Sequence, residues 1–210
     1  MSQVGAPRTS RLTPSAHEQA LERQHSSETR AQAFYEHQVL DHLNGRMRKF
    51  VQQMDLMFIA TADAQGHCDS SVRAGLPGFV RVLDAHRVAY PEYRGNGVMA
   101  SLANIQNNPH MSLLFLDFAD TALGLHVNGQ AHLAGPGDPS TPPGTLSDPA
   151  AELWVVVAVE EAYIHCSKHI PRMTRHREAV EWGTDDPAKK GGDYFGVSAD
   201  RRRSPEPFRS

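Results

Sequence analysis

Residues 58–118 decide the fold of this chain. They read FIATADAQGHCDSSVRAGLPGFVRVLD (58–84), AHRVAYPEYRGNGVMASLANIQNNPH (85–110) and MSLLFLDF (111–118). Short apolar runs alternate with turn residues, so this stretch predicts strand, turn and strand, followed by a loop rich in Arg, Gly and Asn. A short helix is expected at 98–106. It ends near Asn108 because a residue that precedes proline disfavours the α conformation.

The rest of the chain extends this pattern in both directions. Strands are predicted at 58–61, 70–73, 79–82, 87–90, 111–118, 123–133 and 153–164, and helical spacing occurs at 15–43, 45–54 and 167–182. Hairpin-like spacing between most strands favours an antiparallel sheet closed into a small barrel, with the helices outside it. The predicted class is therefore mainly β with flanking helices (α+β), and a doubly wound parallel sheet is disfavoured.

The composition and the positions of glycine and proline indicate how the chain is divided into a domain, a tail, an extension and loops. Residues 1–15 lack periodicity and are predicted to be a flexible tail, 16–182 a single domain, and 183–210 a C-terminal extension. The Pro- and Gly-rich stretch 135–149 is expected to be a loop.

Charge and cysteine content exclude several classes of protein. The net charge of -3 argues against a nucleic-acid binder. Only two cysteines, Cys68 and Cys166, occur in 210 residues, which favours a reducing compartment over a disulfide scaffold. The N-terminus lacks the apolar core of a secretory signal, and no apolar run is long enough to span a membrane. A cytoplasmic protein without membrane or nucleic-acid partners is the expectation.

Residues 45–170 resemble the flavin-binding split barrel of the pyridoxamine 5′-phosphate oxidase family. The resemblance is carried by ATADAQG (60–66) leading into a polar strand, the strand pair after it, and NNPH (107–110) before MSLLF (111–115). The segments LPGFVRVLD (76–84), YPEYRGN (90–96) and HCSKHI (165–170) look more like a separate branch of the family than the oxidase itself.

The resemblance implies a flavin mononucleotide (FMN) site at a homodimer interface. By it, the phosphate is held from two places, which in this chain are Ser70, Ser71 and Arg73, and then Arg94, Asn96 and Ser101. The chemistry agrees, because arginine forks and a helix N-terminus both suit a phosphate dianion. One residue at a time, the arginines read as surface residues and the nearby glycines as turns. As an ordered set they favour a phosphate site.

The sequence departs from the oxidases at one point of this site. Ala100-Ser101 stands where the oxidases carry a basic pair, so Arg73 and Arg94 would have to compensate for the missing charge. Around the flavin ring, the resemblance implies contacts from Tyr90, Pro91 and residues 80–82. The alternative for Val80 and Val82 is plain core.

Other polar residues remain open in their roles. Asn128 and Gln130 lie on a strand that approaches the partner subunit's flavin in relatives, or they face solvent. Lys168 is a cation near the cofactor or an acidic substrate, or a solvent-exposed lysine. A zinc reading of the HC dipeptides at 67–68 and 165–166 lacks suitable ligand spacing, so no metal site is predicted. The predicted site residues are Ser70, Ser71, Arg73, Val80, Arg81, Val82, Tyr90, Arg94, Asn96, Ser101, Asn128 and Lys168.

These features predict an FMN-dependent oxidoreductase that acts on a small organic substrate. The alternative on the same fold is a non-catalytic flavin- or haem-binding protein for storage or sensing. A deazaflavin enzyme is disfavoured by the uncharged segment 97–101, and an interaction protein using the Arg201–Arg203 tail or the N-terminal helices is a further alternative. Pyridoxamine 5′-phosphate oxidation itself is not expected, because the tail RRRSPEPFRS (201–210) lacks the oxidase's substrate segment.

Overall fold

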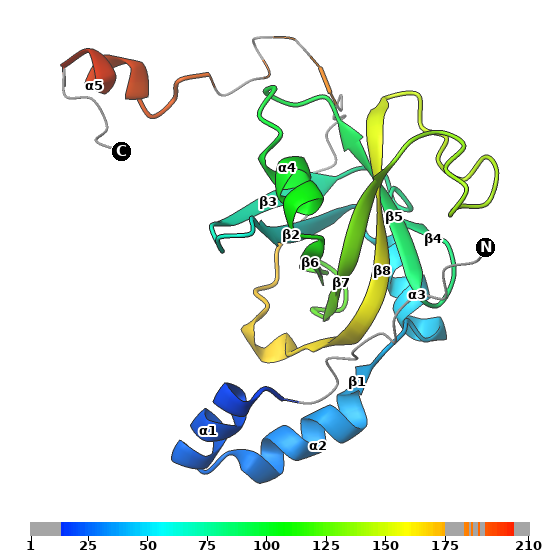
Figure 1. The fold of residues 1–210 in the computed structure, drawn as a ribbon, viewed down its shortest axis with the longest axis vertical. Helices are drawn as coiled ribbons and strands as arrows, with labels where there is room; N and C mark the ends of the chain where they lie inside the picture. The colour runs from blue at the N-terminus through cyan, green and yellow to red at the C-terminus, as the bar shows by residue number, and fades with distance from the viewer. Residues whose placement is uncertain (1–13, 175–182, 185, 187–188, 190–191, 204–210) are drawn as a thin grey trace.

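The protein is an open antiparallel sheet with helices on its periphery (Figure 1). The computed structural model describes residues 14–174, 183–184, 186, 189 and 192–203. Its strands are β1 (Val39–Leu40), β2 (Leu56–Ala62), β3 (Cys68–Ala74), β4 (Arg81–Val82), β5 (Arg87–Tyr93), β6 (His110–Leu116), β7 (Gly124–Ala134) and β8 (Ala151–His165). Its helices are α1 (Ala16–Gln24), α2 (Glu28–Gln38), α3 (Gly45–Gln53), α4 (Ala100–Asn107), the 3₁₀ turn η1 (Ser167–His169) and α5 (Val197–Arg203).

The strand order is β3-β2-β6-β7-β8-β5-β4, with β1 added to β8, and every pairing is antiparallel. The sheet curves but does not close, because its two ends, β3 and β4, pair with one neighbour each. The predicted mainly antiparallel fold of the split-barrel type is confirmed, but the closure into a small barrel that the strand spacing suggested is not observed. Among the described helices, none is long and apolar enough to cross a membrane.

The β2–β3 hairpin follows its sequence signal. The Asp63 carboxylate accepts from the backbone N–H groups of Gln65 (2.9 Å) and His67 (2.9 Å), which fixes the turn. Gly66 has φ of 86°, a conformation that suits glycine because it lacks a Cβ. The resulting register places Ser71 opposite Ile59 and fixes which residues of β3 lie beside which residues of β2.

The core lies on the concave side of the sheet. Leu125, Val127 and Gly129 of β7 are buried while His126 and Asn128 between them are partly exposed, as the alternation predicts. Phe115 and Val155 are fully buried beside them. Burial of a side chain of this size contributes about 1.5–3 kcal/mol. Trp154 belongs to a smaller cluster on the other side, with Ala89, Ala134, Leu146 and Val156.

Most sequence-based elements differ by a few residues at their ends, and β5 continues through Pro91 to Tyr93 where the sequence predicted an end at Tyr90. Three elements differ more. The helical stretch at 15–43 splits at Ser26, which has φ of 51°, and helix gives way to β1 at Val39. In the segment 79–82 only Arg81–Val82 is a strand, and Phe79 and Val80 are core residues outside it. Of the helix predicted at 167–182, residues 167–169 form η1 and residues 170–174 are not helical, because Ile170 precedes Pro171 and is extended. Residues 175–182 lie outside the described part.

Part of the expected tail and extension has a described conformation. Ser15, placed in the N-terminal tail by the sequence, is the N-cap of α1 and forms a capping box with Glu18. The C-terminal extension contains α5. Residues 1–13 are not among those described, and the division into one domain with two appendages stays a prediction.

Candidate functional site

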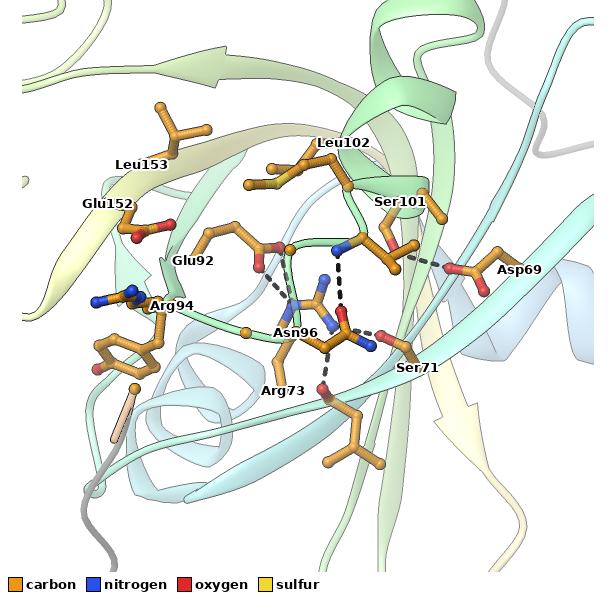
Figure 2. Close-up of a pocket in the computed structure, with 18 of the residues that line it drawn as sticks. Asp69, Ser71, Arg73, Glu92, Arg94, Asn96, Ser101, Leu102, Glu152 and Leu153 are labelled. Carbon is orange, nitrogen blue, oxygen red and sulfur yellow. Dashed lines mark hydrogen bonds and ion pairs between the residues drawn. The ribbon is translucent and has the colours of Figure 1, made fainter. Parts of the chain in front are cut away.

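A cavity of about 470 Å³ lies at the open side of the sheet, within the usual range for small-molecule sites. Its walls come from β3, the end of β5, the loop at 94–99 and the start of α4, with additions from β8 and Gly183 (Figure 2). Two of these parts, β3 and the segment from the loop at 94–99 into α4, are the ones that the family resemblance assigns to the phosphate. The lining residues are 69, 71–74, 92–102, 152–153 and 183.

The loop that precedes α4 is shaped by its own polar and glycine residues. Asn96 Oδ1 accepts from the backbone N–H of Val98 (3.0 Å), and Gly97 has φ of 85°. A Cβ on Gly95 or Gly97 would have no atom within 4 Å, so the glycines leave open space beside the cavity. The loop keeps the backbone accessible at this wall.

Helix α4 begins at the cavity without a side-chain cap. Its N-cap residue is Met99, which makes no capping hydrogen bond. The first N–H groups of a helix have no intrahelical partner and carry a partial positive charge. Ala100, Ser101 and Leu102 all line the cavity, so the α4 N-terminus contributes donors where an anionic group could lie.

Arg73 and Glu92 form the central ion pair of the cavity. Arg73 Nε donates to Glu92 Oε1 (2.8 Å) and Oε2 (2.9 Å), and the two side chains are only 18% and 11% exposed. Arg73 Nη1 donates to Ser71 Oγ and to the Val72 carbonyl (3.1 Å). Figure 2 shows the guanidinium held between Glu92 and Ser71. Burial raises the pKa of Glu92, and the charge and hydrogen bond of Arg73 oppose that rise without cancelling it.

A second carboxylate approaches the start of α4. Ser101 Oγ donates to Asp69 Oδ2 (2.7 Å), which ties the helix to β3. Asn104 on the same helix donates to Thr61 Oγ1 (3.1 Å). The Ser101 hydroxyl is thus already used within the protein, and α4 is fixed against β2 and β3 by two side-chain bonds.

The cavity is not strongly basic. Its lining carries the guanidinium groups of Arg73 and Arg94 and the carboxylates of Asp69, Glu92 and Glu152. Beside it, the Tyr93 hydroxyl donates to Asp148 Oδ2 (2.8 Å), and burial together with that carboxylate raises the pKa of Tyr93 to about 12. A phosphate would find donors here, but little excess positive charge.

The structure brings together some of the predicted site residues and separates others. Ser71, Arg73, Arg94, Asn96 and Ser101 all line the cavity. Ser70 is exposed on β3 and is not among the lining residues.

The predicted ring contacts lie elsewhere. Val80 and Tyr90 are fully buried in the core and Val82 packs against it, which is the placement that the core alternative expects for both valines. Arg81 is exposed and its Nη1 donates to the Gly78 carbonyl (2.8 Å). Pro91 is buried on β5 and is not part of the lining. In this chain these side chains do not reach the cavity.

Asn128 and Lys168 are also outside the cavity. Asn128 Nδ2 donates to Glu161 Oε1 (2.6 Å), and Asn128 Oδ1 is buried with no partner among the described residues. Gln130 is exposed and donates to Glu160 Oε1 (2.5 Å). Lys168 is exposed on η1. Whether these residues contact a cofactor bound by a second subunit stays a prediction.

The histidine- and cysteine-containing segment at 165–169 makes a different arrangement from a metal centre. His165 Nδ1 lies 2.9 Å from His126 Nε2, and the Tyr163 ring stacks on His126. Cys166 and His169 are exposed. Across the described ranges, no three His, Cys, Asp or Glu side chains are grouped to hold a metal ion.

Sequence reasoning missed the acidic residues of the cavity. Glu92 follows Val88 and Tyr90 at alternate positions of β5, and both of those side chains lie in the core. A charged residue at the next inward position was the available signal, because a buried carboxylate needs a partner. Asp69 carried no comparable signal, since it stands among polar residues at the start of β3.

Comparison with known proteins now identifies the family. Residues 43–166, more than half of the chain, match the model of the pyridoxamine 5′-phosphate oxidase family. The chain belongs to the pyridoxamine 5′-phosphate oxidase family. Among curated proteins, none matches it significantly.

Several solved structures of low sequence identity match part of this chain. HupZ from Group A Streptococcus is 18% identical, with 58% of this chain and 93% of that chain covered and a TM-score of 0.43. HutZ, the heme storage protein from Vibrio cholerae, is 14% identical, with 58% and 94% covered and a TM-score of 0.40. A Clostridium acetobutylicum protein related to general stress protein 26 is 11% identical, with 57% and 85% covered and a TM-score of 0.42. Likeness at this level says nothing about ligand or activity.

Proposed function

We propose that this protein binds FMN in the cavity between β3 and α4 and acts as an oxidoreductase on a small organic substrate. The observation that carries the proposal is the convergence of Arg73, Arg94 and the uncapped N-terminus of α4 on one cavity of about 470 Å³. These donors come from the two segments that the family resemblance assigns to the phosphate. Membership of the family supports the same cofactor.

The residues present fit the cofactor in size and in donor type. Arg73, Arg94 and the first N–H groups of α4 would hold the phosphate, since charge-assisted donors and a helix N-terminus are favourable partners for a dianion. Val72, Met99 and Leu153 supply apolar wall for the ring system. When bound, flavin supplies the redox chemistry, and the protein orients the substrate and tunes the ring.

The proposal includes a homodimer. Val72, Val98 and Met99 line the cavity and are 53%, 71% and 53% exposed. Apolar side chains grouped beside a cavity suit contact with another surface, which a second copy of the chain would provide. The same contact would cover the open side of the cavity and exclude water from it.

The test is the content and the binding of cofactor by the purified chain. Flavin has an absorbance spectrum that haem does not share, so the spectrum of the isolated protein and mass analysis of what denaturation releases identify the ligand. We expect flavin bands, or their appearance after incubation with FMN and gel filtration. Haem bands with no flavin uptake would favour a storage or sensing protein and reject the proposal.

A further inference from the structure

We propose that Glu92 is an internal competitor for the ligand's phosphate, and that it restrains the affinity of the cavity for phosphate-bearing ligands by occupying Arg73. This inference rests on the proposed function, because it concerns how the same cavity recognises FMN. It assigns a role to a carboxylate that the family resemblance did not point to.

The geometry shows how far Arg73 is already engaged. Its Nε contacts both oxygens of Glu92, at 2.8 and 2.9 Å, and its Nη1 is shared between Ser71 and the Val72 carbonyl. Of the three guanidinium nitrogens of Arg73, only Nη2 has no acceptor among the described residues. Of the five N–H donors of a guanidinium, the two on Nη2 are therefore the ones left for a ligand.

The charge of Glu92 acts on Arg73 in the same direction as its hydrogen bonds. The side chains of Glu92 and Arg73 are both mostly covered, so solvent screens their attraction little. A phosphate that approaches Arg73 meets a guanidinium whose positive charge is offset by Glu92, and the Glu92 carboxylate also repels the phosphate. The other carboxylates of the lining are placed differently, since Asp69 accepts from Ser101 and Glu152 is exposed.

The competition between Glu92 and the phosphate matters more because the basic pair of the oxidases is missing at the start of α4. Ala100-Ser101 brings no charge to the start of α4, and Ser101 donates to Asp69. The phosphate would therefore depend on Arg73 and Arg94. Because Glu92 holds one of these two cations, a single carboxylate sets a large part of the affinity for the phosphate group.

The experiment measures dissociation constants of FMN and of riboflavin for the wild-type chain and for Glu92→Gln. Glutamine keeps the shape and one acceptor oxygen for Arg73 but removes the charge. We expect Glu92→Gln to bind FMN at least about tenfold more tightly, since partly buried charge pairs have effects of this size. Riboflavin lacks the phosphate, so its affinity is expected to change less than about threefold.

Glu152→Gln is the matched control. It removes a carboxylate from the same lining, but an exposed one, and screening limits its expected effect on FMN to less than about threefold. Inorganic phosphate is the second ligand, measured by its shift of the thermal unfolding midpoint. That shift is expected to be larger in Glu92→Gln than in the wild type, and the unfolding curve also confirms that the variant folds.

The outcomes separate the two proposals. Equal or weaker FMN binding by Glu92→Gln, beside a wild type that binds FMN, overturns the role of Glu92 and leaves the proposed function standing. An equal gain for riboflavin also overturns it, because the phosphate would then not be the group concerned. If neither form binds FMN or phosphate, the FMN proposal and the inference both fail.

Discussion

The Arg73–Glu92 ion pair joins the two ends of the open sheet. Arg73 lies on β3 at one end of the strand order, and Glu92 lies on β5 next to the other end, with β2, β6, β7 and β8 between them. The pair thus bridges the split of the barrel through side chains, where no backbone ladder connects the strands. Both residues also line the cavity (Figure 2), so the pair connects the strands at the site where we propose that the ligand binds.

The pair is expected to be coupled in stability. Arg73→Met alone leaves the Glu92 carboxylate buried and unpaired, so it should lower the free energy of unfolding by about 2–4 kcal/mol. The double variant Arg73→Met/Glu92→Gln should be less destabilised than Arg73→Met, because the unpaired charge is gone. Urea unfolding of the single and double variants measures this coupling. Additive effects would show that the pair does not bridge the split.

Asp117 is expected to stabilise the β6–β7 turn in a pH-dependent way. Burial raises its pKa, but hydrogen bonds from the Thr121 hydroxyl and from the backbone N–H groups of Ala119, Asp120 and Thr121 outweigh that and lower it to about 2. The folded pKa lies below the unfolded value, so the contribution is present above about pH 4 and is lost as the pH falls toward 2. We expect about 1 kcal/mol after allowance for screening.

The measurement is the free energy of unfolding of Asp117→Asn and of the wild type at several values between about pH 2.5 and about pH 7. The difference between the two should shrink as the pH falls. Asp120→Asn, an exposed residue of the same turn, is the control and should leave the stability nearly unchanged. A difference that stays constant over this range would contradict the assignment.

A cation at the start of α4 is expected to strengthen FMN binding. Ala100 is exposed and lines the cavity, so Ala100→Lys would restore one charge near the phosphate. We expect an affinity gain of about three- to tenfold at low salt that diminishes at high salt, as for other exposed charges. Gln106→Lys places the same charge at the other end of α4 and should have little effect. Equal gains from both variants would mean a nonspecific charge effect.

The proposed dimer contact is expected to depend on Val98. A charge on this apolar surface would be buried in the contact without a partner, so Val98→Asp should shift the chain from dimer to monomer. Light scattering after gel filtration measures the mass, which is 23.1 kDa for one chain. Leu21→Asp changes another exposed apolar residue, on α1, and should leave the mass unchanged. A wild type that is monomeric at micromolar concentration would contradict the dimer.

Local sequence patterns predicted most of the sheet. Alternation along β7 and the Asp63–Gly66 turn are set by neighbouring residues, so they could be identified from the sequence. The end of the helical stretch at Val39 could not be, because β1 forms by pairing with β8, which is more than 100 residues away in the chain. Tertiary pairing of this kind overrides local propensity.

The site was predictable only in its basic half. Arg73 and Arg94 are conspicuous in a stretch rich in glycine, and the family resemblance places them together. Glu92 meets Arg73 only because the sheet curves until its ends approach, which no local pattern records. Tyr90 was expected at a flavin ring, but alternation along β5 places it with Val88 in the core.

The central claim, that the cavity binds FMN through Arg73, is tested most directly by fluorescence titration of FMN with the wild type, Glu92→Gln, Arg73→Met/Glu92→Gln and Arg81→Met. The double variant removes the phosphate donor without leaving a buried unpaired carboxylate, and Arg81 is an exposed arginine outside the cavity. The wild type and Arg81→Met should bind one FMN per chain with similar affinity. The double variant should bind at least about tenfold more weakly than Glu92→Gln, in which Arg73 no longer faces a charged carboxylate. The absence of saturable binding to the wild type, or binding by the double variant as tight as that by Glu92→Gln, would contradict the claim.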